Sequence, residues 1–300
     1  MTSPVARLAS FCLILALATC YGWEVHAFDF NAAYLNGKLG EGEEIYMQQP
    51  PGYEVGSEEW VKELLKVIYG LKQAGCKWYD ILYRVLIELG FRVSAADPCV
   101  FYIHIGEHVL IIAIHIDDCA MTGSSVKLIL EYKEKLNACY PLTDLSPISW
   151  LLGIKITRDL TTGTISLSQQ SYVDSIIACF ALNDAKPYDM PMTPSALYSK
   201  DNSPSTQQDA ACMRKVPYRE AIGSLMYASI ATRPNITFAV SMLSQFLDNP
   251  GEAHWEAVKR VFWYLSGMRD YALMSRYFPS LTLRRFSFHI VLYLFTLVQY

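Results

Sequence analysis

The sequence predicts an α+β fold on three observations. Between residues 22 and 182, β-prone runs occur beside amphipathic segments with helical spacing. After residue 215 the pattern becomes helical. Of the 300 residues, 52% are hydrophobic and 18% are charged, so the chain can bury a core and is not mainly disordered. This length allows one large domain or two of ordinary size.

The first β-prone segment, Gly22–Phe30, predicts a strand in which Trp23, Val25 and Ala27 alternate with polar residues. This strand carries Asp29 near its end. Apolar positions at helical spacing predict one helix over Glu58–Tyr69 and another over Ala74–Leu89, which Gly90 ends.

A hairpin with acidic residues at its tip is predicted next. Cys99–Ile103 reads as a strand, and Val109–Ile116 is a strongly β-prone run that stops at Asp117 and Asp118 before apolar sequence resumes. An amphipathic helix over Lys127–Cys139 follows.

The rest of the chain predicts two more strands, a linker and several helices. A segment rich in Pro, Ser, Asp and Asn, Asp184–Gln208, is the best linker in the chain. The strands are expected over Trp150–Ile156 and Thr164–Leu167, and the helices over Tyr172–Leu182, Tyr218–Thr232, Ile236–Leu247 and Ala253–Leu265.

Both ends of the sequence contain apolar segments. The run Leu8–Ala18 follows Arg7 and fits either a secretory signal peptide or a buried helix. It is too short to span a bilayer, and the apolar segment Phe286–Tyr300 is also short for a span.

Charge and cysteine content restrict the function classes. A net charge of -4 argues mildly against nucleic-acid binding, although local basic patches matter more than the sum. The eight cysteines include no C-x-x-C pair, which disfavours a zinc ribbon, and we expect mostly reduced, buried thiols.

Asp29, Asp117 and Asp118 are the residues most suited to chemistry. Unpaired, desolvated carboxylates are costly and readily take up protons, and a divalent metal removes that cost. Two or three carboxylates at adjacent strand ends are the usual protein part of a two-magnesium phosphoryl-transfer site. Such a site requires the Gly22–Phe30 strand to lie beside the hairpin. The local pattern leaves open a second interpretation, in which Asp117 and Asp118 form a solvated hairpin tip.

Several motifs, in order and at fitting spacing, resemble copia-type retrotransposon reverse transcriptases over roughly residues 3 to 273. They are Asp29–Gly37 (DFNAAYLNG) with Glu44–Pro50 (EIYMQQP), Tyr69–Tyr79 (YGLKQAGCKWY), Asp97–Tyr102 (DPCVFY), Ile114–Gly123 (IHIDDCAMTG), Leu151–Ile156 (LLGIKI), Ile165–Val173, Tyr218–Ile236 and His254–Leu265.

The resemblance implies a right-hand polymerase fold: partial fingers, palm and thumb, followed by a mainly helical connection region. It divides the chain into fingers and palm (1–145), palm end and thumb (146–190), a linker (191–215), the connection region (216–273) and an unmatched apolar tail (274–300). It also implies that Leu8–Ala18 is the helix before the first catalytic strand rather than a signal peptide. We expect a fragment of a Gag-Pol polyprotein, in which the upstream fingers segment and ribonuclease H are absent.

By the same resemblance, Asp29, Asp117 and Asp118 are the catalytic, metal-binding triad for Mg²⁺ or Mn²⁺. One metal would lower the pKa of the primer 3′-hydroxyl, and the other would hold the triphosphate and neutralise the departing pyrophosphate. Asp29 and Asp117 would hold both metals, with Asp118 nearer the primer-end metal.

Four further residues are expected to contact the nucleotide. The backbone N–H of Phe30 would meet the triphosphate, and the ring of Tyr34 would lie beneath the deoxyribose and clash with a 2′-hydroxyl. Gln73 would sit near the templating pair, and Lys155 would approach the triphosphate; Lys72 is a weaker candidate for a phosphate contact. Each has a structural alternative: Tyr34 as a core aromatic, Gln73 as a polar helix start, and Lys155 as an exposed strand lysine.

Histidines mark the main departure from the family pattern. His115 replaces the aromatic residue that usually stands two places before the first acid of the hairpin, which affects positioning of the primer end. His104, His108 and His115 lie on β-structure without ligand spacing, so we expect no metal site there.

The predicted activity is that of an RNA-directed DNA polymerase acting on an RNA or DNA template with primer and deoxynucleoside triphosphates. We expect truncation to impair the activity. We also expect other parts of the retroelement polyprotein as partners, and no stable membrane partner. Localisation by resemblance is intracellular, in the cytoplasm or a virus-like particle. The alternatives are an inactive retroelement relic with residual nucleic-acid binding, and a secreted or membrane-associated protein with genuine targeting segments.

Overall fold

The computed structural model describes residues 3–40, 42–57, 60–182, 186–194, 198–276 and 295–299. The described chain forms two compact units, one up to Ser149 and one from Trp150 onward. The apolar segment predicted over Phe286–Tyr300 lies outside the described residues except for 295–299.

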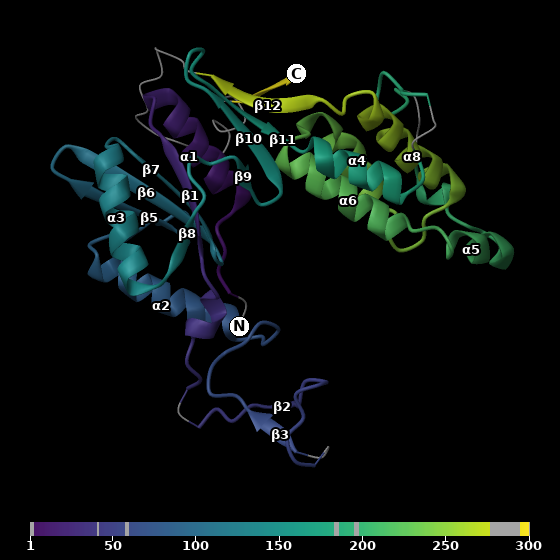
Figure 1. Ribbon diagram of the computed structural model, residues 1–300. Helices are drawn as coiled ribbons and strands as arrows, with labels where there is room; N and C mark the ends of the chain where they lie inside the picture. The colour runs from purple at the N-terminus through teal and green to yellow at the C-terminus, as the bar shows by residue number, and fades with distance from the viewer. Residues whose placement is uncertain are drawn as a thin grey trace. The chain divides into compact units, whose positions relative to one another are not determined.

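The first unit is built on a six-stranded antiparallel sheet with the order β4-β5-β6-β7-β1-β8 (Figure 1). Its strands are β1 (Val25–Phe30), β4 (Arg92–Val93), β5 (Val100–Ile105), β6 (His108–His115), β7 (Asp118–Gly123) and β8 (Leu142–Asp144). The predicted hairpin is confirmed as β6–β7. The required pairing is confirmed too, because β1 lies directly beside β7.

Two helices cover one face of this sheet and bury a common core (Figure 1). They are α2 (Ala74–Glu88) and α3 (Val126–Cys139), both close to their predicted bounds. The core that they share with the sheet includes Trp78, Leu82 and Leu86 from α2, Ile129 and Leu136 from α3, and Phe28, Ile112, Cys119 and Met121 from the strands.

The helix α1 (Leu8–Tyr21) contacts β6 and β7 and confirms the predicted buried helix at the start of the chain. Because strand side chains alternate between faces, Ala27, Ala113 and Ala120 lie on the face opposite the α2–α3 core. All three alanines are buried, and their small side chains allow close approach of a helix.

Strand β1 is shorter and more buried than the sequence predicts. Trp23 and Glu24 lie outside β1, and Gly22 is the left-handed C-cap of α1 with φ 67°. His26, expected on a polar face, is buried, because β1 is an interior strand covered on both faces. Burial on both faces removes the alternation that an edge or half-exposed strand would show.

The helix predicted over Glu58–Tyr69 is wrong. The structure forms a two-stranded antiparallel sheet here from β2 (Tyr46–Gln48) and β3 (Val61–Glu63). The side chains of Trp60 and Leu65 are 62% and 84% exposed, so the apolar spacing does not bury a helical face. A helix with no surface to pack against gains little from amphipathic spacing.

The second unit contains a five-stranded antiparallel sheet with the order β13-β12-β11-β10-β9. Its strands are β9 (Trp150–Leu151), β10 (Ile154–Asp159), β11 (Thr164–Ser168), β12 (Tyr271–Arg276) and β13 (Phe295–Gln299). The single strand predicted over Trp150–Ile156 is therefore divided, because Leu152 and Gly153 adopt φ 50° and φ 73° in a tight turn.

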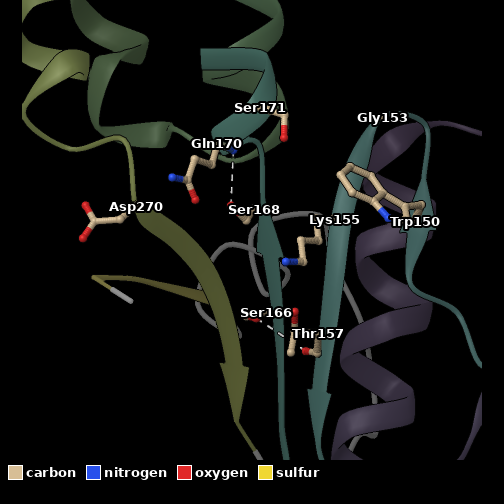
Figure 2. A pocket seen from close by; sticks show the side chains of 9 residues that line it. All are labelled: Trp150, Gly153, Lys155, Thr157, Ser166, Ser168, Gln170, Ser171 and Asp270. Carbon is tan, nitrogen blue, oxygen red and sulfur yellow. Dashed lines mark hydrogen bonds between the residues drawn. The ribbon is translucent and has the colours of Figure 1, made fainter. Parts of the chain in front are cut away.

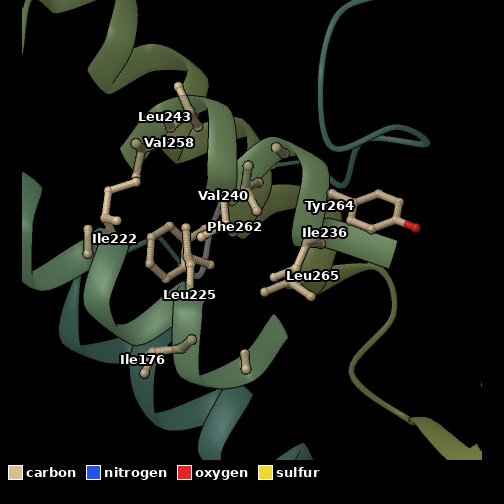
Figure 3. Packing of buried hydrophobic residues seen from close by; sticks show 14 of the residues in the cluster. Ile176, Ile222, Leu225, Ile236, Val240, Leu243, Val258, Phe262, Tyr264 and Leu265 are labelled. Carbon is tan, nitrogen blue, oxygen red and sulfur yellow. The ribbon is translucent and has the colours of Figure 1, made fainter. Parts of the chain in front are cut away.

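Helices make up the rest of the second unit and share one hydrophobic core (Figure 3). This core joins α4 (Gln170–Cys179), α6 (Tyr218–Ala231), α7 (Thr237–Ser244) and α8 (Glu252–Ser266) through residues that include Ile176, Leu225, Val240 and Phe262. The linker predicted over 191–215 is not wholly irregular, since it contains the short elements η2 (Lys200–Asn202) and α5 (Gln207–Met213). Division of this unit into palm end, thumb and connection region stays a prediction.

Among the described residues, each helix is too short or too polar to cross a bilayer.

Candidate active site

Sheet pairing brings the three predicted aspartates to one end of β1 and β7. Asp29 and Asp118 are directly opposite each other in the antiparallel register. In such a pair the Cβ atoms are about 4.5–5.5 Å apart and the side chains share a face. Asp117 lies in the turn immediately before β7. Residues separated by nearly 90 positions in the sequence are thus neighbours, and all three are half-buried.

The hairpin tip that carries Asp117 is held from two sides. Its backbone is unusual because Ile116 has φ 65°, a left-handed conformation that costs a β-branched residue energy. The buried indole of Trp78, on α2, donates a hydrogen bond to the Ile116 carbonyl at 2.8 Å. On the other side, the amide of Phe30 donates to the Asp117 carbonyl at 3.2 Å.

The nearness of the carboxylates raises pKa values at this end of the sheet. Burial raises the pKa of Asp29, and the charges of Asp117 and Asp118 raise it further. Burial and Asp117 also raise the pKa of Asp118, which His115 opposes. The buried thiol of Cys119 has a pKa well above its usual value, through burial first and then the charges of the three aspartates. This end of the sheet therefore carries unbalanced negative charge.

A preformed metal cage is not part of this arrangement. Within the residues that the structure describes, no group of three or more His, Cys, Asp or Glu side chains is placed to hold a metal ion. The chemistry of the donors is nevertheless suitable, because hard divalent cations prefer carboxylate oxygens and would relieve the repulsion between Asp29 and Asp118.

Tyr34 lies close to the aspartates. It belongs to the short helix η1 (Ala33–Asn36), and its pKa is raised by burial and by the charge of Asp117. Its ring contacts that of Tyr69 at a centroid distance of 4.6 Å. Tyr69 has a raised pKa, caused first by burial, then by the charges of Asp117 and Asp29, and in part by a hydrogen bond to Asp117. Sequence reasoning did not single out Tyr69, although this residue begins the motif Tyr69–Tyr79.

Gln73 and Lys72 lie at the start of α2. Gln73 occupies the N-cap position, but its side chain makes no capping hydrogen bond. It is half-buried, whereas Lys72 is exposed. This position agrees with the alternative interpretation of Gln73 as a polar residue at a helix start. Its place near the templating pair stays a prediction.

Phe30 is a core residue through its side chain, which packs edge-on against Trp78. Its amide, predicted to meet a triphosphate, is occupied by the hydrogen bond to Asp117. A triphosphate contact at this amide would require the hydrogen bond to Asp117 to break. This contact stays a prediction.

The histidines have separate surroundings. His115 pairs with Asp118 in the β6–β7 register, and its Nδ1 lies 3.4 Å from the Ala6 carbonyl oxygen. His108 contacts the hydroxyl of Ser124 at 3.2 Å, and His104 packs edge-on against Tyr102. Of these three histidines, His115 is therefore the one next to a predicted catalytic residue.

Lys155 belongs to the second unit, on β10. Figure 2 shows it lining a pocket together with Ser166, Thr157 and Trp150. The pocket has a volume of about 260 Å³. Asp270 also lines this pocket and contributes the opposite charge. The approach of Lys155 to a triphosphate stays a prediction.

Asp97 has a structural role that the sequence motif does not reveal. Its buried carboxylate accepts hydrogen bonds from the Arg7 amide at 2.9 Å and the Ser10 hydroxyl at 2.6 Å. It also accepts from the amide of Cys99 at 3.0 Å. Asp97 thus caps α1, whose own N-cap residue supplies no side-chain acceptor.

Comparison with known proteins gives a consistent result. Residues 1–194 match the family described as reverse transcriptase (RNA-dependent DNA polymerase). The chain is 39% identical, over 88% of its length, to the retrovirus-related Pol polyprotein from transposon TNT 1-94 of Nicotiana tabacum. It is 32% identical, over 95% of its length, to the Pol polyprotein from transposon RE1 of Arabidopsis thaliana.

A yeast protein of more similar length also matches. The chain is 29% identical, over 83% of its length, to the putative transposon Ty5-1 protein of Saccharomyces cerevisiae, of which it covers 78%. In contrast, it covers only 20% and 19% of the two plant polyproteins. The chain therefore spans about a fifth of the length of those relatives.

Proposed function

Because the chain belongs to the reverse transcriptase family of copia-type transposons, we propose that it carries the RNA-directed DNA polymerase site of that family. The observation that supports this most strongly is the register pair Asp29–Asp118, with Asp117 in the adjoining turn. The reaction would extend a primer on an RNA or DNA template with deoxynucleoside triphosphates.

Asp29, Asp117 and Asp118 would hold two divalent metals, Mg²⁺ or Mn²⁺. When bound, one metal would activate the primer 3′-hydroxyl and the other would stabilise charge on the leaving pyrophosphate. The three carboxylates contribute negative charge on the rigid end of a buried sheet, and their mutual repulsion in the metal-free protein favours binding of a cation. Trp78 and Phe30 fix the backbone on either side of Asp117.

Around this end of the sheet, Tyr34 and Gln73 would orient the nucleotide. The half-buried ring of Tyr34 would support the deoxyribose and exclude a 2′-hydroxyl. Gln73, free of any capping role, would contact the templating pair. Lys155 and the exposed Lys72 are the cations proposed for phosphate contacts.

We expect residues 1–300 alone to extend primers slowly. Their net charge of -4 gives little general attraction to a phosphate backbone. His115 faces Asp118, where the family usually has an aromatic residue, and this weakens positioning of the primer end. The second candidate function is an inactive relic that retains weak nucleic-acid binding, and the same low charge and His115 favour it.

Primer extension with Mg²⁺ or Mn²⁺ tests the proposal. The assay compares residues 1–300 alone with the same residues fused behind the preceding segment of the tobacco relative. We expect slow extension by the first and faster extension by the second, abolished in both by Asp117→Asn. Asp80→Asn, an exposed position on α2, is the matched control and should change nothing. Extension that survives Asp117→Asn would contradict the assignment of the site, and a folded fusion without activity would favour the relic.

A further inference from the structure

Two tyrosines distant in the sequence form an aromatic pair beside the aspartates. The rings of Tyr34 and Tyr69 have centroids 4.6 Å apart and planes inclined at 51°. Tyr34 is half-buried, whereas Tyr69 is 54% exposed. An aromatic residue that is half exposed yet packed on another ring is well placed to limit the movement of that ring.

The backbone keeps the two tyrosines together independently of their side chains. The amide of Val67 donates to the Gly37 carbonyl at 3.0 Å, and Lys38 and Lys66 form an isolated antiparallel bridge. Val67 is fully buried, which anchors the segment that leads to Tyr69. The segment after Tyr34 and the segment before Tyr69 are therefore joined by antiparallel backbone pairing.

The other end of Tyr34 lies against α2. A Cβ atom added at Gly75 would be 3.7 Å from the Tyr34 hydroxyl oxygen, which is ordinary van der Waals contact. The residue before Tyr34, Ala33, is completely buried in the core. Tyr34 thus follows a core residue, has its hydroxyl near α2, and packs along its ring against Tyr69.

We propose that Tyr69 is a positioning residue that holds the ring of Tyr34 and thereby sets the discrimination between deoxyribose and ribose. Steric exclusion of a 2′-hydroxyl requires a wall that does not move, and a ring free to rotate away would exclude little. Tyr69 supplies a packing surface for the Tyr34 ring. The inference rests on the proposed function, since it presupposes that the site binds a nucleoside triphosphate.

Competitive binding of dATP and ATP tests this without requiring turnover. The ratio of the two dissociation constants is measured by calorimetry on residues 1–300 with a primer-template and Mn²⁺. We expect Tyr34→Ala to abolish the preference for dATP and Tyr69→Ala to reduce it about three- to tenfold, the range expected for loss of one aromatic contact. Tyr69→Phe keeps the ring and should keep the preference. Tyr53→Ala, another exposed tyrosine in the same unit, is the matched control.

The outcomes separate this inference from the function on which it rests. If the wild type binds neither nucleotide, or binds both equally, the proposed function fails. If Tyr34→Ala removes the preference and Tyr69→Ala leaves it intact, only the role of Tyr69 is overturned. A loss in Tyr69→Phe equal to that in Tyr69→Ala would also overturn it, because the hydroxyl and not the ring would then be responsible.

Discussion

Two of the hairpins in the first unit, β6–β7 and β2–β3, differ in almost every respect except their antiparallel pairing. In β6–β7, Ile112 and Met121 are fully buried, and the turn between the strands carries Asp117. In β2–β3, every residue is exposed or half-buried. An isolated two-stranded sheet is marginally stable in water, so the unit depends on β6–β7 for both its core and its site. Substitutions in the two hairpins should therefore have very different effects.

The largest expected effect is at the support of the buried hairpin. Trp78→Ala removes a buried ring and the donor to the Ile116 carbonyl, and should lower the free energy of unfolding by about 3–5 kcal/mol. Trp78→Phe keeps most of the packing but leaves that carbonyl without its donor, and should cost about 1–3 kcal/mol. Urea denaturation followed by circular dichroism measures both. Equal costs for the two variants would mean that the packing contributes nothing beyond the hydrogen bond.

A smaller loss is expected where the two strands of the hairpin approach most closely. A Cβ atom at Gly123 would lie 2.4 Å from the Val109 carbonyl oxygen and 2.5 Å from a methyl group of Leu110. Gly123→Ala should therefore destabilise the unit by about 1–3 kcal/mol, as overpacking does. Gly223→Ala, in α6, has nothing within 4 Å and should stabilise slightly because alanine favours helix. The sign of the change in unfolding midpoint distinguishes the two.

At the edge of the sheet, an ion pair should make stability depend on pH. The buried ammonium of Lys133 lies 2.6 Å from a carboxylate oxygen of Asp144. Burial raises the pKa of Asp144, but hydrogen bonds from Lys133 and Ser146 outweigh this and lower it to about 2. The folded-state pKa is below the unfolded value of about 3.9, so the stabilisation is complete above that value and is lost as pH falls toward 2.

The variant Lys133→Met tests this dependence. Because Asp144 is largely exposed, its solvent-screened contribution should be about 1 kcal/mol or less at neutral pH. The difference between wild type and variant, from urea denaturation at several pH values, should shrink as the pH falls from 5 to 2. A difference that stays constant over this range would show that Lys133 acts through packing alone.

The smallest effect is expected in the exposed hairpin region. Leu65 is 84% exposed, so Leu65→Ser should change the free energy of unfolding by no more than about 0.5 kcal/mol. The same denaturation experiment measures it. A loss above about 1 kcal/mol would show that this region packs against something, and would remove the contrast between the hairpins.

The two hairpins also show how far the sequence determines the fold. The run Val109–Ile116 is continuous and apolar and ends at two acids, and these features predict a buried strand and its turn. Trp60, Leu64 and Ile68 have helical spacing, yet no surface is there to bury a helix. Periodicity predicts an element correctly only where tertiary packing uses the periodic face. Hence α2, α3 and α8 were predictable, and β2–β3 was not.

The candidate site was predictable in part for the same reason. Asp29, Asp117 and Asp118 follow from local pattern and family motifs, and the register places Asp29 opposite Asp118. The contacts that hold them come from distant segments: Trp78 at the hairpin tip, Asp97 at the start of α1, and Tyr69 beside Tyr34. No local spacing encodes such contacts, because each joins residues that only the folded chain brings together.

The central claim is that strand β1 and the turn of β6–β7 together form one divalent-cation site. Titration of Mn²⁺ into residues 1–300, followed by electron paramagnetic resonance of the free ion, tests it without any turnover. The account predicts that Asp29→Asn and Asp118→Asn each weaken Mn²⁺ binding, while Asp80→Asn leaves it unchanged. Binding of Mn²⁺ by Asp29→Asn with the affinity of the wild type would contradict the claim, since β1 would then contribute no ligand.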